Sequence, residues 1–142
     1  MADFEKVGAL ILCGDCLLLC RKGRDTSQLI LPGGRIEPGE SELDCLAREL
    51  REELGAVSVQ SAAHLGTYQD RAALDDPAAA KTVRIALYHT ELCGEPAPSS
   101  EIVELVWFGP DADRSRLSPI LINRILPDLY ARGILPWGAA LP

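Results

Sequence analysis

The stretch GRIEPGESELDCLARELREELGA, which runs from Gly34 to Ala56, carries the strongest structural signal in this chain. Ser41 is a good helix N-cap, and Gly55 is a residue that typically lies just beyond the last helical turn. Between these two residues the apolar positions recur at the spacing of one helix face, namely Leu43, Leu46, Ala47, Leu50 and Leu54. The spacing therefore predicts an amphipathic helix that buries this face.

A second face of the same helix is strongly acidic. On a wheel of about 100° per residue, four glutamates cluster there: Glu42, Glu49, Glu52 and Glu53. The wheel places Arg48 between Glu52 and the apolar face, so we interpret the acidic face as a stripe of carboxylates without interleaved cations. Like charges at this spacing weaken a helix. A solvated helix face is one explanation, and a bound hard cation such as Mg2+, which takes oxygen ligands, is the other.

The rest of the chain predicts an alternation of strands and helices. Expected strands are residues 7–12, 17–21, 57–68, 82–92 and 102–108, of which the first two form a hairpin. We expect a flexible corner at Gly33-Gly34, a loop over residues 69–81, and a second helix from Ser118-Pro119 to Arg132 that Pro127 kinks or splits. This order favours an α/β fold.

Composition limits the functional classes. A length of 142 residues favours one domain over residues 1–142. The net charge of −7 argues against nucleic-acid binding, which requires a positive surface. The start of the chain lacks the pattern of a signal peptide, and its longest apolar run is too short for a bilayer, so we expect a cytoplasmic protein without a membrane partner.

The five cysteines are an odd number and are expected to be reduced in such a compartment. Cys13 and Cys16 form a CxxC pattern, which can hold zinc or carry out redox chemistry. No second CxxC or CxxH pair accompanies it in the sequence, and Gly14-Asp15 lies where a hairpin turn belongs. Small residues that flank a turn are the better interpretation.

The acidic helix and the residues before it resemble a known family motif. A glycine, five residues, a glutamate, seven residues and then Arg-Glu-aliphatic-x-Glu-Glu-x-Gly-aliphatic is the pattern of the Nudix box. This sequence supplies Gly34, Glu40, Arg48, Glu49, Leu50, Glu52, Glu53 and Gly55, and departs only at Ala56, where a larger aliphatic residue is usual. The resemblance implies the Nudix fold, an α/β/α sandwich around a mixed β-sheet. It also implies hydrolysis of a nucleoside diphosphate linked to another group.

The resemblance further implies a metal site for Mg2+ or Mn2+. Glu52 and Glu53 would be the principal ligands, and the Gly33 carbonyl, just before the box, would be another. Glu49 would be a further ligand or the group that deprotonates water.

Arg48 would orient one of the box glutamates by pairing with Glu40 or Glu49. Two positions outside the box also gain candidate roles from the resemblance. Glu101 would supply an extra metal contact or a base, as a glutamate in this region does in MutT-like members, and Glu104 is the weaker candidate. Arg21 is our choice for a phosphate-binding cation at the end of the second strand, ahead of Lys22 and Arg24.

The substrate class follows less directly. MutT-like enzymes place a base-reading asparagine just before the last helix, where this chain has Leu117 and Ser118, so we do not expect specificity for oxidised guanine. The small size favours nucleoside triphosphates or nucleotide sugars as small-molecule substrates. Many relatives are homodimers. Some Nudix domains have lost catalysis and act as nucleotide sensors, but such loss damages the box glutamates, and here all are present.

Overall fold

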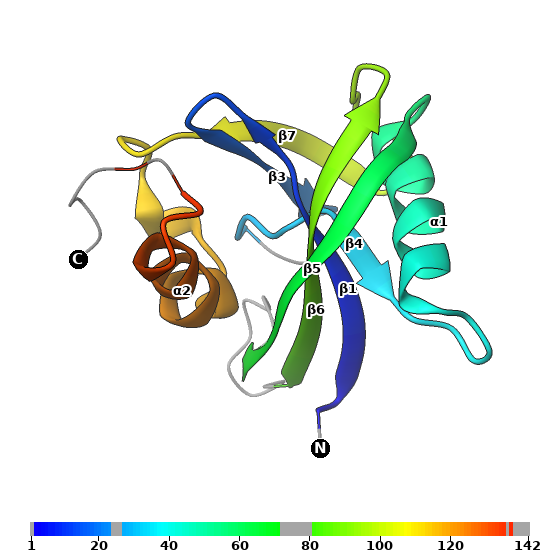
Figure 1. Cartoon of the computed structure of the whole chain (residues 1–142), viewed down its shortest axis with the longest axis horizontal. Helices are drawn as coiled ribbons and strands as arrows, with labels where there is room; N and C mark the ends of the chain where they lie inside the picture. The colour runs from blue at the N-terminus through cyan, green and yellow to red at the C-terminus, as the bar shows by residue number, and fades with distance from the viewer. Residues whose placement is uncertain (1, 24–26, 72–80, 136, 138–142) are drawn as a thin grey trace.

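The computed structural model describes residues 2–23, 27–71, 81–135 and 137. Two helical layers enclose the strands: α1 (Glu42–Leu54) covers one side and α2 (Leu126–Ala131) the other (Figure 1). The chain therefore has the α/β/α arrangement of the Nudix sandwich, as the sequence predicted.

The strands form two sheets. The four-stranded sheet has the order β4-β1-β6-β5, built from β4 (Gly33–Arg35), β1 (Phe4–Leu10), β6 (Thr82–Cys93) and β5 (Ser58–Arg71). In this sheet β1 runs parallel to β6, whereas β1–β4 and β5–β6 are antiparallel, so the sheet is mixed. The second sheet is antiparallel and has the order β2-β3-β7, from β2 (Leu12–Cys13), β3 (Cys16–Lys22) and β7 (Ile102–Phe108).

Local chemistry explains the bounds of α1. The Ser41 hydroxyl accepts a hydrogen bond from the Asp44 amide at 3.0 Å, and Gly55 ends the helix with a φ of 79°, a conformation that glycine adopts readily. Leu46, Leu50 and Leu54 are buried as expected. The predicted apolar face is wrong at its edge, because Leu43 is exposed.

Two further expectations from the sequence are corrected. Gly33 and Gly34 form strand β4 and pair with Gly8 and Val7 of β1, so they are an ordered edge strand and not a flexible corner. Strand β5 continues to Arg71, three residues into the predicted loop, and bulges between Val59 and Ser61 and between His64 and Gly66. Residues 72–80 of that loop lie outside the described residues. The predicted first strand divides at Ile11, which lets β1 and β2 join different sheets.

The second helix runs from Pro119 to Ala131 without a break. Residues Leu121–Ile125 adopt a π-helical turn, in which the Leu126 amide donates to the Leu121 carbonyl. This wider turn comes just before Pro127, which lacks an amide hydrogen, so the helix absorbs the proline by a local change of pitch.

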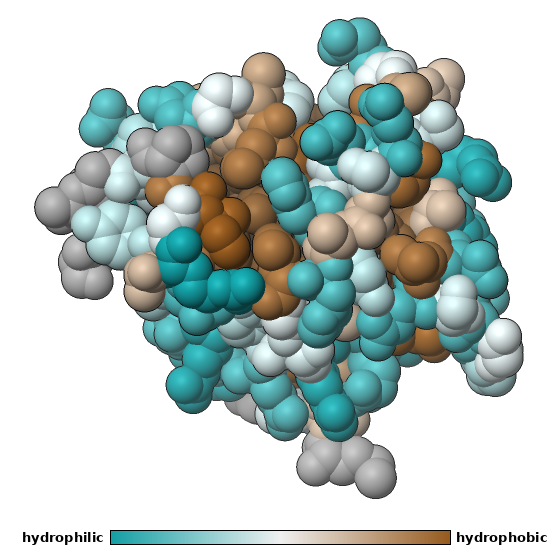
Figure 2. Space-filling model, viewed as in Figure 1, coloured by the Kyte–Doolittle hydropathy of each residue, from teal (hydrophilic) through white to brown (hydrophobic). Residues whose placement is uncertain are grey.

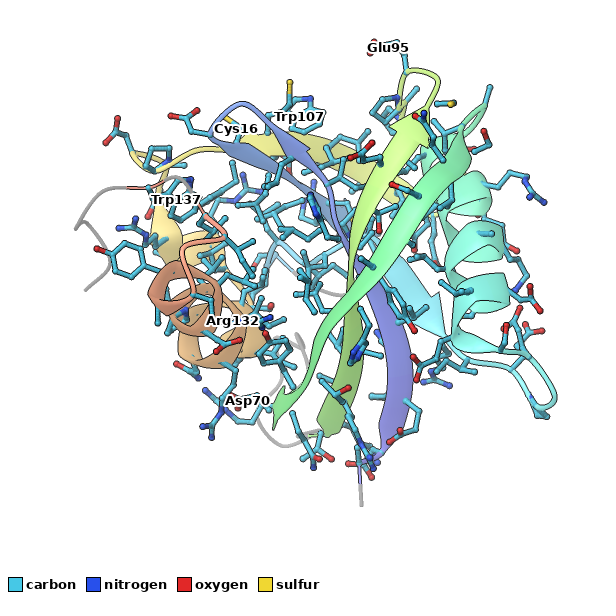
Figure 3. All side chains as sticks on the ribbon, viewed as in Figure 1. Cys16, Asp70, Glu95, Trp107, Arg132 and Trp137 are labelled. Atoms are coloured by element: carbon cyan, nitrogen blue, oxygen red, sulfur yellow. The ribbon has the colours of Figure 1, made fainter. Side chains whose placement is uncertain are left out.

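The core has two parts, one on each side of the strands. The α1 side holds Val7, Leu18 and the buried α1 face, and the α2 side holds most of the larger apolar residues, including Phe108 and Trp137. Trp137 lies between α2 and the β2–β3 hairpin (Figure 3), where its indole Nε1 donates to the Asp15 carbonyl. Apolar side chains also reach the surface between α2 and the strands (Figure 2). Within the described residues, no helix has the length and apolar character that a membrane span requires.

Candidate active site

Strand β4 lies between β1 and α1, and its two glycines make both approaches feasible, Gly33 toward β1 and Gly34 toward α1. A Cβ on Gly33 would lie 2.0 Å from the Val7 carbonyl oxygen, and one on Gly34 would lie 2.3 Å from Cδ of Glu49. Real Cβ atoms do not approach other atoms this closely. The missing side chain at Gly34 therefore leaves the space that the Glu49 carboxylate fills.

Glu53 is the most deeply placed of the box glutamates, with 1% of its surface exposed. Its Oε1 accepts a hydrogen bond from the Gly33 amide at 2.8 Å. Its Oε2 is 2.7 Å from the ammonium of Lys22, which also donates to the Gly33 carbonyl at 3.0 Å. Burial raises the pKa of the Glu53 carboxyl, while the Lys22 ammonium and the Gly33 amide act in the opposite direction.

The same ion pair acts on Lys22. Burial alone would lower the pKa of its ammonium, but the charge and the hydrogen bond of Glu53, with smaller contributions from Cys20 and Glu49, outweigh burial, so the pKa is raised. The carboxylate of Glu101 approaches the ammonium to 3.9 Å. Lys22 is thus the cation around which Glu53, Gly33 and Glu101 are arranged.

Arg48 connects the remaining box glutamates. Its guanidinium donates to both carboxylate oxygens of Glu40, at 2.7 and 2.9 Å, and to Glu49 at 3.0 Å. It also reaches Glu52 at 3.4 Å. The interpretation of an uninterrupted carboxylate stripe was therefore wrong, because the long arginine side chain spans the angle that the helical wheel assigned to it. The contacts with Glu40 and Glu49 are the pairings that the family resemblance implied, and the orienting role of Arg48 stays a prediction.

The hydrogen bonds from Arg48 hold the pKa of the Glu40 carboxyl at about 2, well below its usual range, with a further contribution from the Glu37 backbone. Glu40 therefore stays ionised at neutral pH. It fixes the guanidinium from one side, so that the other side faces Glu49. The side chain of Glu49 is 13% exposed, whereas that of Glu52 is 53% exposed.

These residues fit a divalent cation in their chemistry. Carboxylates and a backbone carbonyl are the oxygen ligands that Mg2+ and Mn2+ accept. The buried Oε2 of Glu53 has the Lys22 ammonium as its close polar neighbour, at 2.7 Å. Among the described residues, no three His, Cys, Asp or Glu side chains are grouped so that they could hold a metal ion. Metal binding would therefore require a rearrangement of the cluster, for which the Glu52 carboxylate, 53% exposed and 3.4 Å from Arg48, is the freest member.

A cavity of about 420 Å3 opens beside this cluster. Gly33, Gly34, Lys22 and Glu101 are among the residues that line it. Two more cations, Lys6 and Arg35, line the same cavity together with Phe4, over which the Arg35 guanidinium lies at 4.2 Å from the ring centroid. The other lining residues are mainly aliphatic. One polar residue, the buried Ser118, lies among them. Its hydroxyl has no hydrogen-bond partner in the described portion of the chain.

Arg21 lies elsewhere. Its guanidinium donates to Glu104 at 3.1 Å and to the Gly23 carbonyl, and Glu104 also accepts from Arg116 at 2.7 Å. Arg21 is not one of the residues that line the cavity, whereas Lys22 is. The phosphate-binding role of Arg21 stays a prediction, and Lys22 is the better placed of the two.

Reasoning from the sequence passed over Lys6 and Arg35 and weighed Lys22 without choosing it. Neighbouring residues of a strand point to opposite faces, so the sequence placed the side chains of Arg21 and Lys22 on different faces of the strand. Both faces of β3 carry buried leucines, however, so no alternation of polar and apolar residues indicated which face meets the cavity.

Comparisons with known proteins match the chain to the family that its motif resembles. A family model described as the NUDIX domain matches residues 4–123. The chain is similar to a solved NUDIX hydrolase from Nitrosomonas europaea, with a TM-score of 0.72 and 26% identity, over 91% of this chain and 89% of that one. It is also similar to the ORF135 protein of E. coli, with a TM-score of 0.69 and 25% identity, over 94% and 93%.

A third similar structure is a MutT NUDIX hydrolase from Burkholderia pseudomallei, with a TM-score of 0.65 and 25% identity, over 82% of this chain and 90% of that one. A search of curated proteins found no match.

Proposed function

Because the chain belongs to the Nudix family, we propose that it is a metal-dependent pyrophosphohydrolase. Its substrate would be a nucleoside diphosphate linked to another moiety, of the nucleoside triphosphate or nucleotide-sugar type. One observation carries this proposal: the cavity is lined by three cations and by Gly33 and Gly34, the two glycines that lie against the box glutamates Glu53 and Glu49. The cations suit a polyphosphate, and the glutamates suit the ion that such a group carries with it.

Gly33, through its carbonyl, and Glu49, Glu52 and Glu53 would hold Mg2+ or Mn2+. When bound, such an ion lowers the pKa of a coordinated water and offsets negative charge on the phosphate oxygens. Gly33 is suited to this task because its amide already fixes Glu53, so that the carbonyl and the carboxylate lie next to each other.

Glu49 is the residue that we assign to proton transfer. A general base must lie within hydrogen-bond reach of the water from which it takes the proton. The carboxylate of Glu49 is confined between Gly34 and the Arg48 guanidinium, and Glu40 fixes Arg48 in turn. This chain of contacts limits the positions that the carboxylate can take, and such limits on position contribute to catalysis.

The cavity accommodates the rest of the substrate. Lys6, Lys22 and Arg35 would bind the phosphates, and the nucleoside would lie against the aliphatic part of the lining. There the unpaired Ser118 hydroxyl is available to hydrogen-bond a polar edge of the base. A phosphate contact from Arg21 would require it to leave Glu104.

The test is the release of phosphate or pyrophosphate from a nucleotide panel in Mg2+. The panel holds canonical and oxidised triphosphates, ADP-ribose, nucleotide sugars, dinucleoside polyphosphates and NADH. The parent is compared with Glu52→Gln and Glu53→Gln, which keep the side-chain size and remove the charge. We expect turnover by the parent and a loss of at least about 10²-fold in kcat in both variants. Equal rates in all three proteins, or no turnover of any compound, would favour the alternative, a catalytically inactive nucleotide-binding Nudix domain.

We also propose that the chain acts in the cytoplasm as a single domain over residues 1–142. The charge of −7 supports small nucleotides as partners, in place of nucleic acid or a membrane surface. The exposed face of β7 is the contact surface that we propose for a homodimer. It carries the large apolar residues Val103 and Trp107, with 51% and 45% of their surface accessible. Sedimentation at micromolar concentration, on the parent and on Trp107→Ser, tests this association.

A further inference from the structure

The ammonium of Lys22 contacts the same oxygens that the proposed function assigns to a divalent cation. It lies 2.7 Å from Oε2 of Glu53 and donates to the Gly33 carbonyl oxygen at 3.0 Å. Oε1 of Glu101, the third candidate oxygen, is 3.9 Å away. Three oxygens from β4, α1 and the residue just before β7 thus converge on one side chain of β3. This is the arrangement of a cation site, with an ammonium as the cation.

A divalent ion and this ammonium oppose each other at such a site. Mg2+ binds oxygen at about 2.0–2.1 Å, so an ion on the Gly33 and Glu53 oxygens would lie within about 5 Å of the Lys22 nitrogen. The two positive charges repel strongly at that separation, because the surroundings are buried and screen poorly. One of the two cations has to leave the oxygens when the other binds.

The displaced ammonium would remain in the active site. The backbone of Lys22 is fixed in β3, where it pairs with Ile102 of β7. Its side chain is 19% exposed, and it lines the cavity next to Gly23 and Glu101. Rotation of the side chain away from Glu53 therefore moves the ammonium within the cavity, toward the place that we assign to the substrate phosphates.

We propose that Lys22 is a built-in counter-ion of Glu53 that a divalent cation displaces, and that the released ammonium then binds a substrate phosphate. This inference rests on the proposed function, and makes Lys22 a substrate-binding residue that couples metal binding to substrate binding. It predicts effects of opposite sign at one position. Loss of the ammonium strengthens metal binding and weakens phosphate binding.

The experiment measures Mn2+ binding without nucleotide, by the EPR signal of the free ion, and then pyrophosphate binding in saturating Mg2+, by calorimetry. Lys22→Met removes the ammonium and keeps the stem. Lys6→Met is the matched control, because it removes the same charge from the same cavity while the Lys6 ammonium lies at the Phe4 ring. Couplings between sites commonly span about 5- to 150-fold in affinity. We expect Lys22→Met to bind Mn2+ at least about tenfold more tightly, Lys6→Met to change it by about twofold or less, and Lys22→Met to bind pyrophosphate about tenfold more weakly.

Thermal unfolding supplies a second readout, and it guards against poor folding of Lys22→Met. Loss of the ammonium leaves the buried Glu53 carboxylate without a cation, so the Tm should fall in the absence of metal and rise more with Mn2+ than in the parent. Lys22→Arg keeps a cation beside Glu53 and should bind Mn2+ within about threefold of the parent.

Equal Mn2+ affinity in the parent and Lys22→Met, or weaker affinity in the variant, would overturn this inference while leaving the proposed function intact. A tenfold gain of affinity in Lys22→Arg would do the same, because that variant retains the competing charge. Absence of Mn2+ binding in every protein, with Glu53→Gln as the reference, would overturn the inference together with the metal dependence of the proposed function.

Discussion

Replacement of Gly34 by alanine tests how closely the Glu49 carboxylate must be placed. The added Cβ would lie 2.3 Å from Cδ of Glu49, and 2.4 and 2.6 Å from its two oxygens. Ordinary contacts begin near 3.4 Å. The carboxylate must therefore shift by about 1 Å or more, and a misplacement of that size can reduce catalysis by about 10²-fold. The clash involves the end of a flexible side chain, so we expect a stability loss of only about 1–3 kcal/mol.

The assay is kcat for the best substrate of the nucleotide panel in saturating Mg2+, with the Tm measured on the same samples. Gly14→Ala is the control. Gly14 has a φ of 61° in the β2–β3 hairpin, and no atom lies within 4 Å of an added Cβ, so alanine brings local strain without touching the site. We expect comparable losses of stability in the two variants but a loss of kcat in Gly34→Ala alone. A kcat for Gly34→Ala within about threefold of the parent would refute the idea that catalysis needs the Glu49 carboxylate at this place.

Three further predictions concern stability. Gly33→Ala should prevent stable folding as judged by circular dichroism, because its Cβ would lie 2.0 Å from the Val7 carbonyl oxygen and a backbone atom cannot rotate away; a cooperative melt near the parent Tm would contradict this. The pKa of Glu40 is lowered by Arg48 from 4.5 to about 2, so its stabilising effect is complete above pH 4.5 and is lost as the pH falls toward 2. Urea unfolding of the parent and Glu40→Gln should therefore show a difference that shrinks over that range, and a constant difference would count against the ion pair. Trp137→Ala should lower the free energy of unfolding by about 3–5 kcal/mol, because the indole is 4% exposed. A denaturant titration measures this loss, and a value well below about 3 kcal/mol would contradict the prediction.

Local patterns along the chain were sufficient for most of the elements. The strand expected at 102–108 has the bounds of β7, and the helix between Ser41 and Gly55 begins and ends where its capping residues placed it. These successes share a cause. Apolar periodicity and capping residues are features of neighbouring positions in the chain, so the local sequence is sufficient to predict the element and its bounds. The box glutamates were found from their spacing for the same reason.

Contacts between distant segments account for the differences. Gly33 and Gly34 resembled a flexible corner until β1 was placed beside them, since a strand is recognised from its partner as well as from its own residues. The wheel excluded Arg48 from the glutamates, because it records the direction of a Cβ and not the reach of a long side chain that Glu40 attracts from eight residues away.

The sequence by itself therefore determined the family and the α/β/α class, and it predicted the carboxylates that would hold a divalent cation, since each depends on residue type and spacing along the chain. Tertiary structure alone decided which cation faces those carboxylates. The folding of β3 beside β4 and α1 brings the Lys22 ammonium to Glu53, 31 positions later in the chain, while Arg21 turns to Glu104. Alternation along a strand assigns the two side chains to opposite faces, but only the packing of the sheets against the helices gives each face its surroundings.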